Sequence, residues 1–203
     1  MNKRFLILII SSLLSVSVFA AGSKVDPSPM DMVKKTSSQM LRELDKHLGR
    51  LKNNDKLVYS LVNRILVPHF DRLHMAKAVV GRNYWKKASS NVRRDFLAEF
   101  TKYIIRTYSA ALQSYDGETM KFYPIRGAIG KRVRISSDLL LKSGPPIQLQ
   151  YGVWYRDGKW LIYDFSVDGI SIIKNYKSQF AGVLRQKGLS GLLRELKQRN
   201  KRA

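Results

Sequence analysis

Two stretches in the second half of the chain alternate between apolar and polar residues. The odd positions of 147–155 are apolar or aromatic, and so are the odd positions of 161–167. Alternation with a period of two is typical of β-strands that bury one face. The turn-forming residues Arg156-Asp157-Gly158 lie between the two stretches. The pattern therefore predicts a β-hairpin with one apolar face.

The faces of this hairpin predict the length of its turn. A two-residue turn would pair Val153 with Ile162 and divide the apolar residues between the two faces of the sheet. A three-residue turn with a bulge at Gly158 would instead pair Val153 with Leu161 and keep the odd positions together. We therefore predict the three-residue turn. The further pairs that it predicts are Tyr151 with Tyr163 and Leu149 with Phe165.

Before the hairpin, apolar residues recur with the three- and four-residue spacing of amphipathic helices. Ser28-Pro29 has the form of a helix start, and Tyr84 and Trp85 are expected in a loop. The predicted helices are 29–52, 56–66, 71–80 and 89–113. Two more strands are predicted at 119–125 and 132–141.

After Asp168-Gly169 the helical spacing returns. Gly188 is expected to end the first helix there, and Ser190 to cap a short last one. A basic tail, Lys197 to Arg202, closes the chain. Helices, then a four-stranded antiparallel meander, then helices indicate an α+β fold whose curved sheet and helices enclose an apolar pocket.

The first twenty residues have the features of a signal peptide. Lys3-Arg4 precede an apolar stretch at 5–18, and Val18-Phe19-Ala20 offers small residues at the positions that signal peptidase reads. An uncleaved anchor is the alternative, but the stretch is shorter than the roughly 20 residues that span a bilayer. The chain has no cysteine, which excludes a lipid-modified cysteine and disulfides. We expect residues 21–203 to form a single exported domain.

The charge of the chain restricts its partners. It carries 37 basic and 15 acidic residues, a formal net charge of +22, which suits nucleic acid, anionic membranes or anionic ligands. The basic residues are spread along the sequence without an aromatic and basic platform, so we expect no nucleic-acid partner. Anionic lipid fits better, and a generic basic surface is the alternative. We expect dispersed charge to steer docking without holding a particular headgroup.

The sequence offers few groups for catalysis or metal binding. His69 and His74 lack the i, i+4 spacing of paired metal ligands, and His69 in its proline corner suits a structural role. Asp164 and Asp168 are a candidate acid–base pair, but Asp164 is predicted on the polar face and Asp168 at a helix start. No phosphate-loop or nucleophile-elbow motif is present. We expect neither catalysis nor a cofactor or metal.

Several motifs occur together in one order along the chain. They are Val67-Pro68-His69-Phe70-Asp71, Gly144-Pro145-Pro146-Ile147, the run from Tyr163 to Ser171, and Asn175-Tyr176-Lys177-Ser178-Gln179-Phe180 followed by Gly188-Leu189. In this set the chain resembles the MlaC or toluene-tolerance family. Members are periplasmic phospholipid-binding components of the Mla lipid transport system of Gram-negative bacteria.

The resemblance implies a phospholipid carrier that works as a monomer. It would shuttle lipid between the outer-membrane MlaA–porin complex and the inner-membrane Mla ABC transporter, and so maintain the lipid asymmetry of the outer membrane. The alternative is an exported enzyme on a similar cone-shaped α+β fold. The residues expected to line the lipid pocket are Phe100, Ile104, Tyr108, Val133, Ile135, Leu149, Tyr151, Val153, Tyr163 and Phe165.

Overall fold

The computed structural model describes residues 28–201, so the predicted signal peptide lies outside the described residues. Within that range no helix has the length and apolar character needed to cross a bilayer. The helices before the sheet are α1 (Pro29–Lys46), α2 (Leu48–Leu51), α3 (Asp55–Ile65), the short 3-10 helix η1 (Val67–His69), α4 (Arg72–Val80), α5 (Arg82–Lys87) and α6 (Ser90–Gln113). The strands are β1 (Thr119–Phe122), β2 (Arg132–Leu140), β3 (Ile147–Arg156), β4 (Lys159–Val167) and β5 (Ile170–Ser171), and helix α7 (Ile172–Arg199) ends the fold.

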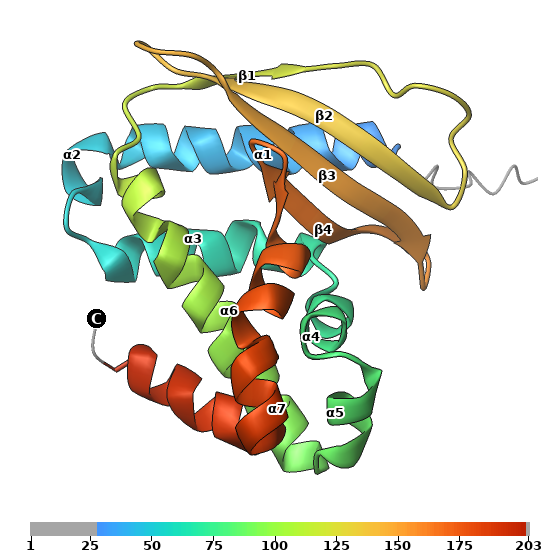
Figure 1. Cartoon of the computed structure of the whole chain (residues 1–203). Coiled ribbons are helices and arrows are strands. Elements are labelled where there is room, and N and C mark those ends of the chain that lie inside the picture. The colour runs from blue at the N-terminus through green and yellow to red at the C-terminus, as the bar shows by residue number, and fades with distance from the viewer. Residues whose placement is uncertain (1–27, 202–203) are drawn as a thin grey trace, which may run out of the picture.

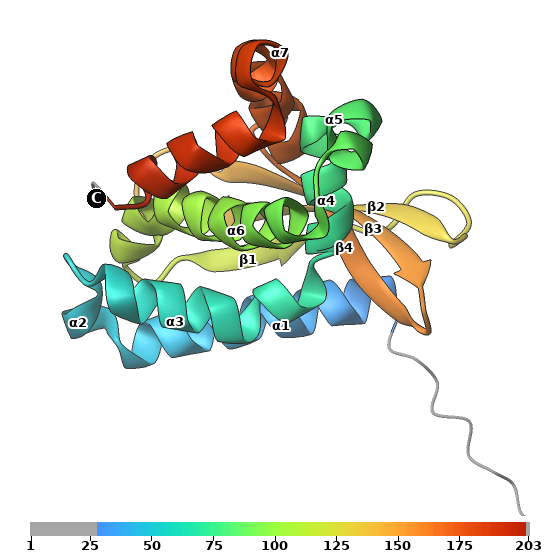
Figure 2. The same ribbon diagram turned by 90° about the horizontal axis from the view of Figure 1, so that it is seen from below.

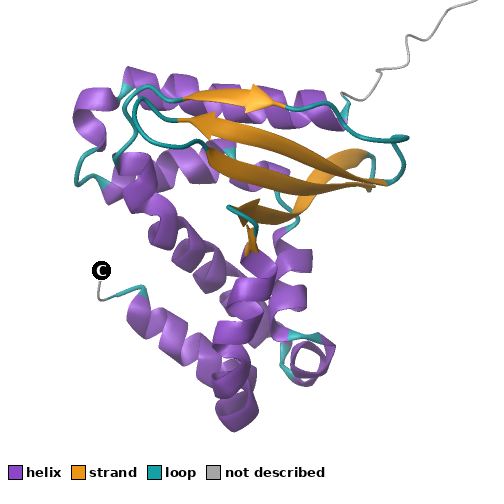
Figure 3. Cartoon of the chain, turned by 45° about the horizontal axis from the view of Figure 1, so that its top comes forward, coloured by secondary structure: helices purple, strands orange, loops and turns teal. Residues whose placement is uncertain are grey.

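The five strands form one antiparallel sheet in sequence order, β1-β2-β3-β4-β5. Figure 3 shows this sheet as one layer, with the helices before and after it on its flanks. The predicted α+β class and meander are therefore confirmed. The strand count is one higher than predicted, because the two residues of β5 pair with the end of β4.

The predicted three-residue hairpin turn is wrong. Arg156 pairs directly with Lys159, so the turn contains only Asp157 and Gly158, whose φ angles are 51° and 78°. Two left-handed residues are what a type I′ turn requires, and its twist matches that of the strands. A bulge does exist, but at Tyr163, where the register shifts between Gly152 and Val153.

This bulge decides which residues share the apolar face of the sheet. Before it Val153 pairs with Ile162, and after it Tyr151 pairs with Phe165, so the one extra residue keeps both pairs on one face. Tyr163 does not join that face. Its ring lies over Gly152, where an added Cβ would stand 2.8 Å from Tyr163 Cζ.

Helix α1 covers part of the apolar face. Met32 and Val33 of α1 are buried against Ile135 and Val153, and Figure 1 shows the helix running along the sheet. Ser28 caps α1 by accepting from Asp31 N at 3.1 Å, as the sequence predicted. The predicted helix over 29–52 is interrupted at residue 47, so α1 and α2 are separate.

The remaining helices form a second layer around α6, with α3, α4 and α7 packed against it (Figure 2). Ser89 caps α6 by accepting from Val92 N at 3.3 Å. Tyr84 and Trp85 belong to the short helix α5, which corrects the predicted loop. The reason is burial, since Trp85 packs into the core between α4, α6 and α7.

Helix α7 is two helical segments joined by a kink at Gly188, which has φ 60° and ψ −169°. The predicted break at Gly188 is thus confirmed. Residues 197–200 of the predicted basic tail are not free, because they contact α6. Asn200 is buried and donates to Glu99 Oε2 at 2.7 Å, and Lys197 donates to Asp95 Oδ2 at 3.1 Å. These contacts fix the end of α7 along α6.

The packing of Tyr163 on Gly152 gives the first prediction. Gly152→Ala is expected to lower the free energy of unfolding by about 1–3 kcal/mol, because the new methyl group overlaps the Tyr163 ring. The control is Gly182→Ala in α7, where nothing lies within 4 Å of the added Cβ, and where alanine is the better helix former. Urea denaturation measures both. Equal stability of Gly152→Ala and the unchanged protein would show that the Tyr163 ring is free to move away.

Candidate functional site

The residues of the apolar sheet face form what we call the sheet cluster. Its buried members are Met32 and Val33 of α1 with Val133, Ile135, Tyr151, Val153 and Ile162 of the sheet. Four residues predicted to line a pocket are buried members of this cluster, namely Val133, Ile135, Tyr151 and Val153, and two more, Leu149 and Phe165, pack at its edge. Tyr163, the remaining strand residue of that prediction, lies on the opposite face.

A second group of apolar residues, the helix cluster, lies between α4, α5, α6 and α7. Phe100 of α6 is buried at its centre, with its ring centroid 5.5 Å from that of Tyr176. Ile104 and Tyr108, also predicted to line a pocket, pack at its edge and stay half-buried. The three predicted helix residues therefore lie together.

Phe70 and Phe165 connect the two clusters. Both are half-buried, and both pack against the sheet cluster and the helix cluster. Phe165 comes from β4, where its ring centroid lies 5.1 Å from that of Tyr151. Phe70 follows η1 and joins the edge of β4 by a bridge to Ile162. This junction is where apolar side chains of the two layers meet without being fully buried.

Tyrosine hydroxyls in this region stay protonated. Burial raises the pKa of Tyr151 and of Tyr108, and burial raises the pKa of Tyr176 to about 12. Each pKa rises because the low-dielectric surroundings disfavour the charged phenolate. The junction therefore presents neutral aromatic rings, which suits an apolar ligand and offers no anionic base.

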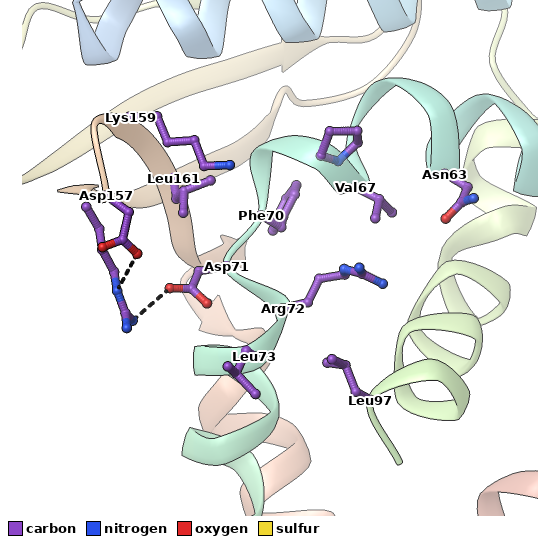
Figure 4. Close-up of a pocket in the computed structure, with 12 residues that line it drawn as sticks. Asn63, Val67, Phe70, Asp71, Arg72, Leu73, Leu97, Asp157, Lys159 and Leu161 are labelled. Atoms are coloured by element: carbon purple, nitrogen blue, oxygen red, sulfur yellow. Dashed lines mark hydrogen bonds and ion pairs between the residues drawn. The ribbon is translucent and has the colours of Figure 1, made fainter. Parts of the chain in front are cut away.

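A cleft of about 670 Å³ opens beside Phe70. Figure 4 shows Phe70 between the β4 residues Lys159 and Leu161 on one side and Arg72 and Leu97 on the other. The wall of the cleft is formed by five segments: the end of α3, η1, the start of α4, part of α6, and the β3–β4 turn with the start of β4. The lining residues are Asn63, Val67, Pro68, Phe70, Asp71, Arg72, Leu73, Leu97, Arg156, Asp157, Lys159 and Leu161.

Basic residues that are spread along the sequence meet at this cleft. Arg72, Arg156 and Lys159 come from α4, β3 and β4, yet all three line the same opening. Beside it, the guanidinium carbons of Arg132 and Arg156 lie 5.2 and 5.6 Å from the Trp154 ring, which is an aromatic and basic group. The motif Val67 to Asp71 supplies part of the lining, but the sequence did not indicate that its cations meet, because Arg72 lies more than 80 residues before Arg156 and Lys159 along the chain.

The carboxylates of the two candidate catalytic aspartates accept hydrogen bonds that hold the local structure. Asp164 accepts from Ser171 Oγ at 2.7 Å and from Ile173 N at 3.3 Å, which holds the start of α7. Asp168 has φ 46° and lies in the turn before β5, not at the helix start, where Ser171 is the cap. It accepts from Gln148 N at 2.9 Å. Neither carboxylate faces the junction as a free acid–base group.

The histidines also have structural surroundings. His74 packs its ring 4.3 Å from that of Trp154, and His69 ends η1. Burial lowers the pKa of both imidazoles, and the charges of Lys159 and Lys35 lower that of His69 further. In residues 28–201 no group of three histidines or acids is arranged to hold a metal ion.

Comparison with known proteins assigns the fold to a family. The model of the MlaC protein family matches residues 34–198. The chain belongs to the MlaC family. Its relatives include the toluene tolerance protein Ttg2D of Pseudomonas putida, 27% identical over 161 residues that cover 79% of this chain and 75% of that protein. They also include the intermembrane phospholipid transport system binding protein MlaC of Haemophilus influenzae, 20% identical over 85% of this chain and 82% of that protein.

A solved structure that is similar to this chain contains a ligand. The phospholipid-binding protein from Ralstonia solanacearum, in complex with a phospholipid, matches with a TM-score of 0.78 and 27% identity. The match covers 87% of this chain and 98% of that chain. The arrangement of the helices and the sheet described above is therefore the arrangement of the family.

The pKa values of the two half-buried histidines, His69 and His74, give the second prediction. Because burial holds both below the value of about 6.5 for an unfolded histidine, the unfolded chain binds protons first as the pH falls. The free energy of unfolding should therefore decrease between about pH 7 and pH 5, above the range where carboxylates titrate. Urea denaturation at several pH values measures the slope. The double variant His69→Gln, His74→Phe should have a flatter slope, and an unchanged slope would contradict the assignment.

Proposed function

We propose that this protein is a phospholipid carrier without catalytic activity. The likeness to the phospholipid-bound structure from Ralstonia solanacearum carries this proposal, because it joins the same fold to a bound ligand at 27% identity. Membership of the MlaC family and the relative named for intermembrane phospholipid transport support it. The tails would lie between the apolar sheet face and the helix layer, at the junction that Phe70 and Phe165 form.

The physical demand on such a carrier is to keep acyl chains away from water. Each buried methylene contributes about 0.8 kcal/mol, so a bare chain crossing water would cost on the order of 10 kcal/mol. The half-buried residues Ile104, Tyr108, Leu149 and Phe165 offer apolar surface that a tail would cover. These four would contact lipid without any separation of the two layers.

The other predicted lining residues have a different place in the proposal. Phe100, Val133, Ile135, Tyr151 and Val153 are already buried within the two clusters. They would touch lipid only where the layers separate to admit it. Tyr163 is left out, because its ring covers Gly152 on the other face of the sheet.

In the cell, the carrier would act between two membranes. Residues 1–20 would direct export and be removed, leaving a single domain from residue 21 onward in the periplasm. The protein would then shuttle lipid as a monomer between an outer-membrane MlaA–porin complex and the inner-membrane Mla ABC transporter. The strongly basic composition supports contact with acidic partners or anionic bilayers, since net charge steers encounters.

Lipid extraction tests the proposal directly. The protein is expressed with its predicted signal peptide, residues 1–20, and is isolated from the periplasm without detergent. Native mass spectrometry then measures its mass. We expect a population carrying the added mass of a diacyl phospholipid, released on denaturation and identified by its headgroup. Protein that carries no lipid under these conditions, and takes none from vesicles, would contradict the carrier function.

Two neighbouring isoleucines of α6 test the location of the tails. Ile104 is half-buried beside the helix cluster, whereas Ile105 is 5% exposed and packs between α1, α3 and α6. Ile105→Ala should lower the free energy of unfolding by about 2–5 kcal/mol and leave lipid retention unchanged. Ile104→Ala should lose less stability but retain severalfold less phospholipid, because it removes apolar surface that a tail covers.

Urea denaturation and the lipid content of each purified variant measure the two effects. Because both variants remove the same atoms from adjacent positions, differences in expression or handling cancel. Equal lipid content in the two variants would place the tails elsewhere.

A further inference from the structure

The cleft beside Phe70 has an apolar floor that continues into the junction. Phe70 packs against both the sheet cluster and the helix cluster, and Leu97 packs against the helix cluster. Both side chains also line the cleft, together with Leu161 of β4. A chain entering the cleft would therefore meet apolar surface that leads towards the space between the two layers.

The charged rim of the cleft is not balanced. Arg156 contacts both acids of the lining, with its Nη1 3.3 Å from Asp71 Oδ2 and its Nε 3.3 Å from Asp157 Oδ2. Arg72 and Lys159 have no ion pair within residues 28–201. Once the two acids are paired with Arg156, two cations remain for a ligand.

The electrostatic surroundings of His69 also indicate unpaired positive charge at the cleft. Besides burial, the charges of Lys159 and Lys35 lower the pKa of His69, and no acid raises it. The imidazole thus lies in a region of positive potential next to Pro68, which lines the cleft. Such a region favours an anion.

Figure 4 shows how the two unpaired cations are placed. Lys159 extends from β4 on one side of the Phe70 ring, and Arg72 extends on the other side from the first turn of α4. Both have long, flexible side chains over an apolar floor. An amphiphile with an anionic head and an apolar body matches this combination of charge and apolar surface.

We propose that this cleft is the mouth of the lipid site, and that Arg72 and Lys159 hold the phosphate of the phospholipid while its tails pass over Phe70. The proposal rests on the carrier function above and adds the place and chemistry of headgroup recognition. Charge-assisted hydrogen bonds from a guanidinium and an ammonium to phosphate oxygens are stronger than neutral ones. The two cations act on the phosphodiester that all common glycerophospholipids share, so they select for phosphate and not for one headgroup.

A comparison of two ligands with the same tails tests the assignment. Phosphatidylglycerol has the phosphate and diacylglycerol lacks it. For the double variant Arg72→Gln, Lys159→Gln, we expect about tenfold weaker retention of phosphatidylglycerol and unchanged retention of diacylglycerol. Binding is measured by uptake of labelled lipid from vesicles at low salt, followed by native mass spectrometry.

The matched control removes the same charge far from the cleft. Arg50 of α2 and Lys56 at the start of α3 are exposed and lie at the other end of α3 from Asn63. The double variant Arg50→Gln, Lys56→Gln should bind both lipids as the unchanged protein does. If this control loses phosphatidylglycerol to the same extent, the net charge of the protein decides retention. That result would contradict the assignment of Arg72 and Lys159 to the phosphate.

The outcomes separate this inference from the proposed function. If Arg72→Gln, Lys159→Gln retains phosphatidylglycerol as the unchanged protein does, the assignment of the phosphate to this cleft is wrong and the carrier function stands. If both lipids are lost together, the two residues serve the fold, and the headgroup assignment fails. If the unchanged protein binds neither lipid, the carrier function itself fails.

A free anion is the remaining alternative. Calorimetric titration with inorganic phosphate alone should show no binding at micromolar concentrations, because the site needs the tails for affinity. Tight phosphate binding by the unchanged protein that disappears in Arg72→Gln, Lys159→Gln would assign the cations to a soluble anion. That result would overturn the assignment to a lipid headgroup.

Discussion

The rest of the structure depends on the burial of one face of the sheet. A single antiparallel sheet with an apolar face must be covered by other elements. Helix α1 covers it with Met32 and Val33, and the junction residues Phe70 and Phe165 connect it to the helix layer. The bulge at Tyr163 makes this possible, because it returns Phe165 to the face that Ile162 already occupies.

The outer edge of β4 shows how the same contacts prevent misassembly. Asp71 N donates to Ile162 O at 2.9 Å, and β5 pairs with Ser166 and Val167. These two segments occupy backbone groups that an exposed edge strand would leave open to another chain. Between them the Asp164 carboxylate accepts from Ser171 Oγ and Ile173 N. Asp164, which resembled a catalytic group, therefore stabilises the junction between the sheet and α7.

A carrier has to combine a stable fold with apolar surface that is not fully buried. In this protein the two requirements fall on different parts of the same elements. On α6, Phe96 and Phe100 are buried in the helix cluster and Ile105 is buried between α1, α3 and α6, whereas Ile104 and Tyr108 remain half-buried. On β3, Val153 is fully buried and Leu149 is not. Under the proposed carrier function, the half-buried residues are the ones that a ligand would cover.

The sequence by itself determined the long helices, the first four strands, their order and the α+β class, because helical and strand periodicities are local. It also determined the cap at Ser28 and the kink at Gly188, since each depends on a few adjacent residues. Only the tertiary structure decided the register at Tyr163, because a bulge is fixed by what each face must bury. It alone brought Arg72 to the cleft that Arg156 and Lys159 line, because the spacing of charges along a chain does not specify their distance in the fold.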